Sequence, residues 1–244
     1  MFPLFSPQNL IYEIFNSFIM TGKEAEDLCK MIRVGVDLSP KYQPRTKEKL
    51  KDLIKKLIEK RGNEADLNDV NVSQITDMSY MFAWSQFNGD ISKWDVRKVK
   101  KMWCMFLNSK FNGDISNWNV SGVEEMGGMF NNSQFTGDIS NWDVSNVKNM
   151  GGMFAKSQFN GDISKWNVSE VRYMNSMFYK SKFNGDISKW DVSKVKGMNY
   201  MFAQSKFNGD ISNWDVSGVV DMEGMFWSSQ FNCDISKWTK KPKR

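Results

Sequence analysis

A motif of 24 residues repeats along most of this chain. Each copy follows the pattern Phe-Asn-Gly-Asp-Ile-Ser-x-Trp-Asp/Asn-Val-Ser-x-Val-x-x-Met-x-x-Met-Phe-x-x-Ser-x. A degenerate first copy occupies residues 63–86, six close copies fill residues 87–230, and an eighth copy stops at Trp238. Because a unit of this length cannot bury its own apolar side chains, consecutive copies must stack on one another and share a core.

The repeat explains the high content of methionine and aromatic residues. Fourteen of the 17 methionines, 14 of the 18 phenylalanines and seven of the ten tryptophans occupy fixed repeat positions. In a stack, each such position forms a column, as with Trp94, Trp118, Trp142, Trp166, Trp190, Trp214 and Trp238. We therefore interpret these residues as core columns and not as a methionine- or tryptophan-rich binding site.

The apolar spacing within one copy predicts its local structure. The segment Ile91-x-x-Trp94-x-Val96 fits the strand of a leucine-rich repeat, and from Val99 onward a spacing of three to four favours a helical or 3-10 return turn. Gly89 lies in an Asn-Gly-Asp corner, where we expect it to take positive φ. The predicted fold class is an α/β repeat solenoid of leucine-rich-repeat type, with short parallel strands and a small N-terminal helical region.

Four regions follow from this pattern: residues 1–38, a small helical segment; residues 39–62, a linker and capping helix; residues 63–238, the repeats; and residues 239–244, a basic tail. The capping helix is predicted from Thr46, a suitable N-cap, to Arg61, with Gly62 ending it. Its apolar stripe consists of Leu50, Leu53, Ile54, Leu57 and Ile58. We expect the stripe to cover the first repeat and its lysines to face solvent; a membrane or nucleic-acid face is the alternative.

Two polar columns carry candidate chemistry. Asp66, Asp90, Asp114, Asp138, Asp162, Asp186, Asp210 and Asp234 recur once per copy. A calcium ion needs six to eight oxygen ligands, so we interpret this column as Asx-turn caps. A second column nearly alternates amide and acid, from Asn71 and Asp95 to Asp191 and Asp215, and we expect its stacked side chains to hydrogen-bond one another.

The residue inventory argues against catalysis. Histidine is absent, which excludes Ser-His-Asp and Cys-His sites and histidine-ligated zinc. Cys29, Cys104 and Cys233 form no Cys-x-x-Cys pair, so neither a disulfide framework nor a zinc ribbon is indicated. A regular ladder of carboxylates offers no unique acid–base pair. We expect a non-enzymatic protein with no catalytic residues, no cofactor, no metal and no small-molecule substrate.

Charge and hydropathy bear on partners and location. The net charge of +5 divides into +4 for residues 1–62, −4 for residues 63–236 and +5 for residues 237–244, so we expect no specific nucleic-acid partner. No apolar run is long enough to span a membrane, and the first residues do not resemble a signal peptide. These features favour an intracellular, cytoplasmic location; a cell-surface location is the alternative if a leader precedes Met1. The tail residues Lys240, Lys241, Lys243 and Arg244 fit a nuclear-import signal or a solubilising tail.

The repeats resemble a known family over residues 42–238. Their unit, close to Phe-Asn-x-Asp-Ile-Ser-x-Trp-Asp-Val-Ser-x-Val, is similar to that of BspA-like leucine-rich-repeat surface proteins and mycoplasma lipoprotein repeats. The resemblance implies a protein-interaction scaffold on a microbial surface that binds host or partner proteins. The chain lacks a lipobox cysteine, in which it departs from that pattern.

The segment from Ser6 to Phe18 resembles the opening of an F-box, whose pattern runs Leu-Pro-x-x-Leu-Leu-x-x-Ile-Phe-x-x-Leu. The matching positions are Leu10, Ile11, Ile14, Phe15 and Phe18. The resemblance implies docking on a Skp1-type adaptor of a cullin ubiquitin ligase, with the repeats recruiting the target. A short helical hairpin that extends the cap is the alternative. The predicted function is thus an F-box-like adaptor, or else a microbial surface repeat protein.

Variation among the copies predicts where a protein partner binds. It concentrates on the return turn, at Tyr80, Trp84, Trp103, Tyr173, Tyr179, Tyr200 and Trp227. Exposed aromatic residues are good interface anchors, and lateral packing between copies is the alternative interpretation. A second candidate surface is the end of the last copy, where Phe231, Ile235 and Trp238 have no following copy to cover them. This end is a dimer or partner surface, or a frayed terminus.

Overall fold

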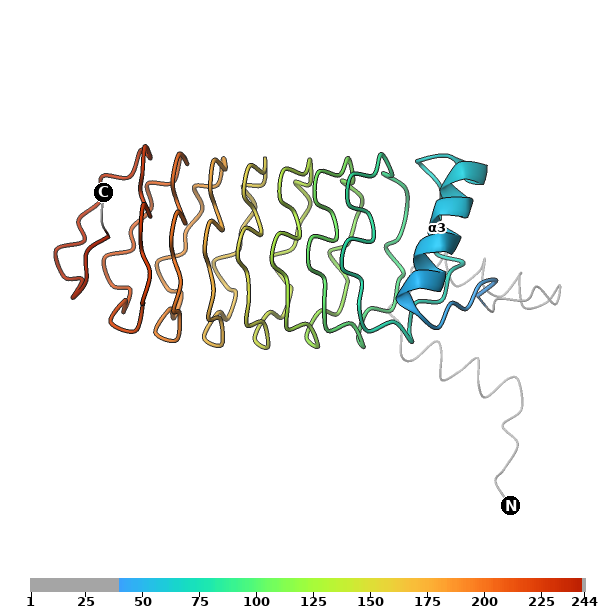
Figure 1. Cartoon of the computed structure of the whole chain (residues 1–244), viewed down its shortest axis with the longest axis horizontal. Coiled ribbons are helices and arrows are strands. Elements are labelled where there is room, and N and C mark those ends of the chain that lie inside the picture. Colours follow the sequence, from blue (N-terminus) through green and yellow to red (C-terminus); the bar gives the residue numbers. More distant parts are fainter. Residues whose placement is uncertain (1–39, 243–244) are drawn as a thin grey trace, which may run out of the picture. The chain divides into compact units, whose positions relative to one another are not determined.

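The chain divides into two units, Met1–Ser39 and Pro40–Arg244. The computed structural model describes residues 40–242, which belong to the second unit. Within this part of the chain the one helix is α3 (Lys47–Arg61), and the repeats follow it side by side in chain order (Figure 1). We number the repeat positions from 1 to 24, with Phe87 at position 1 of repeat 2 and residues 63–86 as repeat 1.

Helix α3 begins and ends as its sequence predicts. The Thr46 hydroxyl accepts a hydrogen bond from the Lys49 N–H, and Gly62, at a φ of 86°, donates its N–H to the Ile58 carbonyl. Leu50, Ile54 and Leu57 are buried in the same core as the repeats; Leu53 and Ile58 are partly buried against it.

Two ion pairs fasten α3 to repeat 1. Lys47 Nζ lies 3.1 Å from Asp77 Oδ2 near the start of the helix. At its end, the Arg61 guanidinium donates to both carboxylate oxygens of Asp69, at 2.9 and 2.8 Å. This bidentate bond raises the pKa of Arg61 and lowers that of Asp69. The predicted position of the cap over the first repeat is therefore confirmed.

The core consists of columns of like side chains. Phe87 and Phe111, one repeat apart, have ring centroids 6.2 Å apart, and Phe106 stacks on Phe111 at 4.4 Å. The Trp94 and Trp118 rings are 6.4 Å apart and within 4° of parallel. Each column tryptophan donates its Nε1–H to an isoleucine or leucine carbonyl 27 residues earlier in the chain. The predicted core columns are confirmed.

The predicted strand does not form, so the predicted fold class is wrong: residues 40–242 contain no β-strand and no sheet. The Trp94 N–H donates to the Ile91 carbonyl at 3.2 Å, and the Val99 N–H to the Val96 carbonyl at 2.9 Å. Two tight turns thus flank the segment expected to be extended. Over Trp94–Val96 no backbone hydrogen bond joins neighbouring repeats, so the segment cannot pair as a leucine-rich-repeat strand would.

Neighbouring repeats are joined instead over positions 15–22. Isolated parallel bridges link position 15 of one repeat to position 15 of the next, as between Lys101 and Glu125. The N–H groups at positions 16, 18, 20 and 22 donate to the carbonyls of positions 15, 17, 19 and 21 of the following repeat; the Phe106 N–H, for example, donates to Met129 at 2.9 Å. The N–H groups of positions 19, 21 and 23 bond three residues back within their own repeat. We call positions 16–22 the linking segment.

Two left-handed residues per repeat explain this pattern. Positions 18 and 22 have positive φ in all seven full repeats. The residues are Tyr80, Trp84, Cys104, Asn108, Gly128, Asn132, Gly152, Lys156, Ser176, Lys180, Tyr200, Gln204, Gly224 and Ser228. Each is the third residue of a turn closed by an i to i+3 hydrogen bond, as type II turns require. Positive φ is incompatible with a strand and with a right-handed helix, so the predicted helical or 3-10 return turn is also wrong.

Glycine at position 3 has another cause than the expected positive φ. The position-3 glycines, such as Gly113, are not among the residues with positive φ. A Cβ at Gly113 would lie 2.9 Å from Cε2 of Phe111, whose ring folds over the glycine two residues later. The close approach of the ring, and not backbone freedom, requires glycine at residue 113. At Gly89, for which positive φ was expected, a Cβ would instead lie 2.1 Å from the Ala65 carbonyl oxygen.

Candidate interaction surfaces

The aspartate column at position 4 is structural. Each carboxylate accepts the backbone N–H of the residue two places later, as from Ser140 to Asp138 at 2.9 Å. This bond lowers the pKa of Asp138. The predicted Asx turns are confirmed. Among residues 40–242, no three histidine, cysteine, aspartate or glutamate side chains are grouped as a metal site requires.

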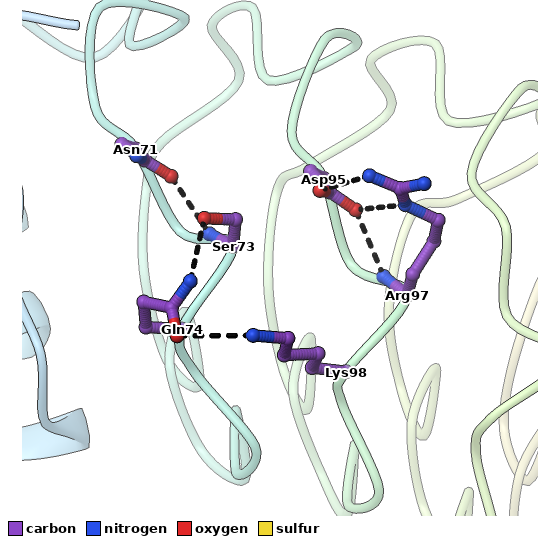
Figure 2. Close-up of polar contacts among 6 residues, drawn as sticks. All are labelled: Asn71, Ser73, Gln74, Asp95, Arg97 and Lys98. Atoms are coloured by element: carbon purple, nitrogen blue, oxygen red, sulfur yellow. Dashed lines mark hydrogen bonds and ion pairs between the residues drawn. The ribbon is translucent and has the colours of Figure 1, made fainter. Parts of the chain in front are cut away.

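The amide and acid column at position 9 differs from the expectation. Figure 2 shows that Asn71 accepts the Ser73 N–H, and that Asp95 accepts the Arg97 N–H and pairs with its guanidinium at 2.8 Å. These side chains bond within their own repeat, so the expected bonding between stacked neighbours is wrong. Polar side chains at position 12 do connect repeats, since Lys98 Nζ donates to Gln74 Oε1 at 3.0 Å (Figure 2).

The predicted return-turn aromatics all lie in or beside the linking segment, between positions 15 and 22. Six are exposed, from Tyr200 at 37% to Trp84 at 63%, and Tyr179 is half-buried. They form two groups along the stack. The first aromatic group is Tyr80, Trp84 and Trp103, in repeats 1 and 2; the second aromatic group is Tyr173, Tyr179, Tyr200 and Trp227, in repeats 5–7.

Repeats 3 and 4 separate the two groups. Their positions 17 and 18 carry Gly127, Gly128, Gly151 and Gly152, whereas repeats 1, 2, 5 and 6 carry a larger side chain at both positions. Between the aromatic groups, these four positions therefore carry no side chain beyond a hydrogen.

The first aromatic group is held by backbone and ring contacts. The Tyr80 and Trp84 rings are 6.4 Å apart and within 5° of parallel. The Tyr80 N–H donates to the Trp103 carbonyl at 2.9 Å. The neighbouring Cys104 sulfur raises the pKa of Tyr80, and burial raises the pKa of the Cys104 thiol. The Tyr80 and Trp84 rings thus stack on each other while both stay exposed.

The second aromatic group rests partly on glycine. Tyr200 lies across position 18 of the next repeat, since a Cβ at Gly224 would be 2.5 Å from its Cε1. The Lys180 ammonium lies 5.2 Å from the centre of the Tyr179 ring. Trp227 lines a cavity of about 480 Å³ at the end of the stack. Sequence variation located these aromatics but did not reveal the glycine beneath Tyr200.

The repeats match a known family at residues 49–160, 108–205 and 155–243, which together span more than half of the chain. The family is described as "Mycoplasma protein of unknown function, DUF285". The chain belongs to the DUF285 family. This agrees with the resemblance to mycoplasma repeats and gives no support to a BspA-like or leucine-rich-repeat assignment. No curated protein and no solved structure matches the chain.

The F-box-like segment lies outside all three DUF285 matches and outside the described residues. It comprises Leu10, Ile11, Ile14, Phe15 and Phe18. Its role as an adaptor-binding segment therefore stays a prediction. Of the residues that the structure describes, no helix has the length and apolar character needed to cross a membrane.

The basic tail begins within the third DUF285 match. Lys240 Nζ donates to the Val219 carbonyl at 2.7 Å, and Lys241 Nζ to the Ser236 carbonyl at 3.0 Å. Lys243 and Arg244 lie outside the described residues. The import signal stays a prediction, but its first two lysines bind main-chain carbonyls of the last repeats.

The last copy of the repeat differs in part from the expected open end. Phe231 and Ile235 are partly buried, whereas Trp238 is 4% exposed, as buried as the tryptophans inside the stack. The expectation that Trp238 is uncovered is wrong, because its ring packs on Trp214 at 6.5 Å and its Nε1–H bonds to the Ile211 carbonyl.

Proposed function

We propose that this protein is a non-enzymatic scaffold that binds a protein partner through the two aromatic groups of the linking segment. The observation that supports this most is the exposure of Trp84 (63%) and Trp227 (52%). In contrast, the tryptophans of the core column are almost fully buried. Exposed tryptophan and tyrosine supply large contact areas at low entropic cost and dominate many interfaces.

The stack suits this role because it fixes the distance between the two groups. Each repeat is joined to the next by four backbone hydrogen bonds over the linking segment and by stacked phenylalanine rings. A partner that touches both groups meets a surface formed before binding, which lowers the entropic cost of association. The four glycines of repeats 3 and 4 leave room for that partner.

The finer role that we propose is an F-box-like adaptor, in which residues 1–38 bind a Skp1-type protein and the repeats recruit the target. Its support is the pattern of Leu10, Ile11, Ile14, Phe15 and Phe18. The alternative is a microbial surface repeat protein, which membership of the DUF285 family supports. An adaptor of this kind acts inside a cell, whereas a surface repeat protein lies outside it. Determining where the protein is found therefore also distinguishes the two roles.

The aromatic surface is tested with a partner captured by the full chain and then purified. Trp84, Trp103 and Trp227 are replaced by alanine, one at a time. The variants that remove a residue at the centre of the interface should bind the partner about tenfold more weakly, or weaker still. Lys93→Ala and Lys189→Ala, at exposed position 7, are the matched controls and should leave the affinity unchanged. Unchanged affinity in all three tryptophan variants would exclude the aromatic groups as the binding surface.

The adaptor role is tested separately, by binding of purified Skp1 to the full chain. Leu10→Asp and Ile14→Asp should abolish that binding, and the tryptophan variants should not affect it. If the unmodified chain does not bind Skp1, the adaptor role is wrong. The scaffold role is still tested by the affinity of the tryptophan variants for the captured partner.

A further inference from the structure

The end of the stack carries a row of backbone donors without acceptors. In repeat 6, the N–H groups of Met198, Tyr200, Phe202 and Gln204 donate to carbonyls of repeat 7 at 2.8–2.9 Å. The equivalent N–H groups of repeat 7 are those of Met222, Gly224, Phe226 and Ser228. None of these four has an acceptor among residues 40–242. We call them the terminal donor row.

A cavity of about 480 Å³ lies beside this row. Its wall contains the apolar side chains of Phe226, Trp227, Phe231 and Ile235, and polar residues complete it, among them Asn232 and Lys241. Inside the stack the equivalent rings are covered: Phe202 stacks on Phe226 at 5.9 Å and is fully buried, whereas Phe226 itself is only partly buried. The cavity is thus the place where the next phenylalanine of the column would lie.

The repeat pattern itself stops before this place is filled. Thr239 and Lys240 follow Trp238, at positions where the other full repeats have Asp or Asn and Val. Lys240 and Lys241 bond instead to the carbonyls of Val219 and Ser236. Through residue 242 the chain therefore leaves the terminal donor row unoccupied.

Hydrogen-bond polarity restricts what can bind there. The row consists of donors alone, so two copies that meet through it would oppose N–H to N–H. A copy does carry complementary acceptors on repeat 1, where no N–H of residues 40–242 donates to the carbonyls of Asp77, Ser79, Met81 and Ala83.

Helix α3 prevents two copies from pairing head to tail. The helix lies beside repeat 1 (Figure 1). Its Leu50, Ile54 and Leu57 are buried in the shared core, and its Lys47 bonds to Asp77, one of the four residues whose carbonyls accept no N–H from residues 40–242. A helix is about 10 Å wide, whereas hydrogen-bonded neighbours lie about 5 Å apart. A second copy therefore cannot approach repeat 1 as closely as the next repeat does.

We propose that the terminal donor row binds a segment of a partner protein that has the pattern x-Met-x-x-Met-Phe-x and folds into the same tight turns as the linking segment. Four alternate carbonyls of that segment accept the N–H groups of Met222, Gly224, Phe226 and Ser228, and its phenylalanine enters the cavity. The argument for this occupant is internal: in repeats 1–6 the same row binds this same pattern. Main-chain bonds provide the affinity, and the pocket for the phenylalanine side chain provides the specificity.

The probe for this proposal is a synthetic peptide with the sequence of residues 219–230, added to the full isotope-labelled chain. Amide hydrogen exchange is followed at single residues by NMR. Without peptide, the four terminal amides should exchange faster than those of Met198, Tyr200, Phe202 and Gln204. Saturating peptide should slow the four at least tenfold and leave the internal four unchanged.

A control peptide with serine in place of its second methionine and its phenylalanine should bind at least tenfold more weakly. Phe231→Asp, at the cavity wall, should weaken binding of the unmodified peptide to a similar extent. Ile58→Asp, which alters another partly buried apolar residue at the far end of the stack, is the matched control. Because the control peptide leaves the protein unaltered, the test holds even if Phe231→Asp perturbs folding.

Three results would overturn the proposal. The first is no binding at 1 mM peptide, and the second is binding that protects residues outside the terminal donor row. The third is protection of the row that grows with protein concentration alone, which would identify a second copy as the occupant. Trp227 lines this cavity and also belongs to the second aromatic group, so Trp84→Ala and Trp103→Ala, at the other end of the stack, test the proposed function independently.

Discussion

The non-glycine residues at positions 18 and 22 carry backbone strain because their φ angles are positive. Left-handed backbone costs a residue with a Cβ about 1–2 kcal/mol, and the chain places Tyr80, Trp84, Lys156 and Lys180 in it. The inter-repeat hydrogen bonds of the linking segment hold these residues there. Glycine at either position removes the strain, whereas glycine elsewhere only loosens the unfolded chain further.

This difference predicts opposite effects for one substitution at two exposed lysines. Lys156→Gly, at a φ of 55°, should raise the free energy of unfolding by about 0.5–1 kcal/mol. Lys110 is not among the residues with positive φ, so Lys110→Gly should lower the free energy of unfolding by about 0.5–1 kcal/mol. Urea unfolding followed by circular dichroism measures both. Equal signs would mean that the left-handed geometry carries no strain.

Gly224 combines positive φ with a close neighbour. Gly224→Ala should lower the free energy of unfolding by at least about 2 kcal/mol. The new Cβ would lie 2.5 Å from the Tyr200 ring, and this clash adds to the backbone strain. Gly152→Ala has a similar φ of 64° and no heavy atom nearer than 3.6 Å, so it should cost only about 1 kcal/mol. In a Tyr200→Ala background the two costs should become equal. A difference that persists there would place the clash elsewhere.

Sequence reasoning succeeded at residue scale where one residue type performs one local task. The aspartate that recurs once per copy indicated the Asx turns. The left-handed positions were missed because their occupants range from glycine to tryptophan. Gly128, Gly152, Asn108 and Asn132 were the available signal, since glycine and asparagine favour positive φ.

At the scale of elements, helix α3 was predictable and the repeat turn was not. An N-cap, an apolar stripe and a terminal glycine determine a helix locally. In the repeat, the spacing Ile91-x-x-Trp94-x-Val96 revealed which side chains face inward. It did not reveal where the backbone hydrogen bonds go, because a series of tight turns can bury the same positions as a strand.

The Asx turns make the stability of this element depend on pH. The pKa values of Asp138, Asp162 and Asp186 are lowered because each carboxylate accepts hydrogen bonds from the serine two residues later. A folded pKa below the unfolded value of about 3.9 gives a contribution that is complete above that pH. The contribution is lost as the pH falls through the folded pKa.

We therefore expect the free energy of unfolding to fall as the pH drops below about 4. Replacing the three aspartates together by asparagine keeps an acceptor oxygen in each turn and should flatten this fall. Urea unfolding at a series of pH values between neutral and strongly acidic measures both proteins. An equal decline in the variant would show that other groups dominate acid unfolding.

At the scale of the whole stack, each repeat contacts its neighbours and little else. Stability in such an array is close to a sum of repeat and interface contributions, and the end repeats open first. Helix α3 covers repeat 1, whereas repeat 7 ends in the terminal donor row. The stack should therefore open more readily from its C-terminal end.

Hydrogen exchange across the repeats measures this asymmetry. Protection should be highest in the central repeats and lower in repeat 7 than in repeat 1. Leu50→Ala, which removes a fully buried side chain of α3, should cost about 2–5 kcal/mol and lower protection first in repeats 1 and 2. The partly buried Leu53→Ala is the matched control and should cost less. A loss spread evenly over all repeats would argue for a single cooperative unit.

Because every unit meets its neighbours in the same way, the fixed length of 24 residues also governs how such a gene can change. Gain or loss of one whole unit leaves the helix at one end, the donors at the other and all internal columns in register. Where the unit lies between the two aromatic groups, the change lengthens or shortens the distance between them. An insertion of any other length would put every later column out of line, so the reach of the molecule can be adjusted only in whole steps.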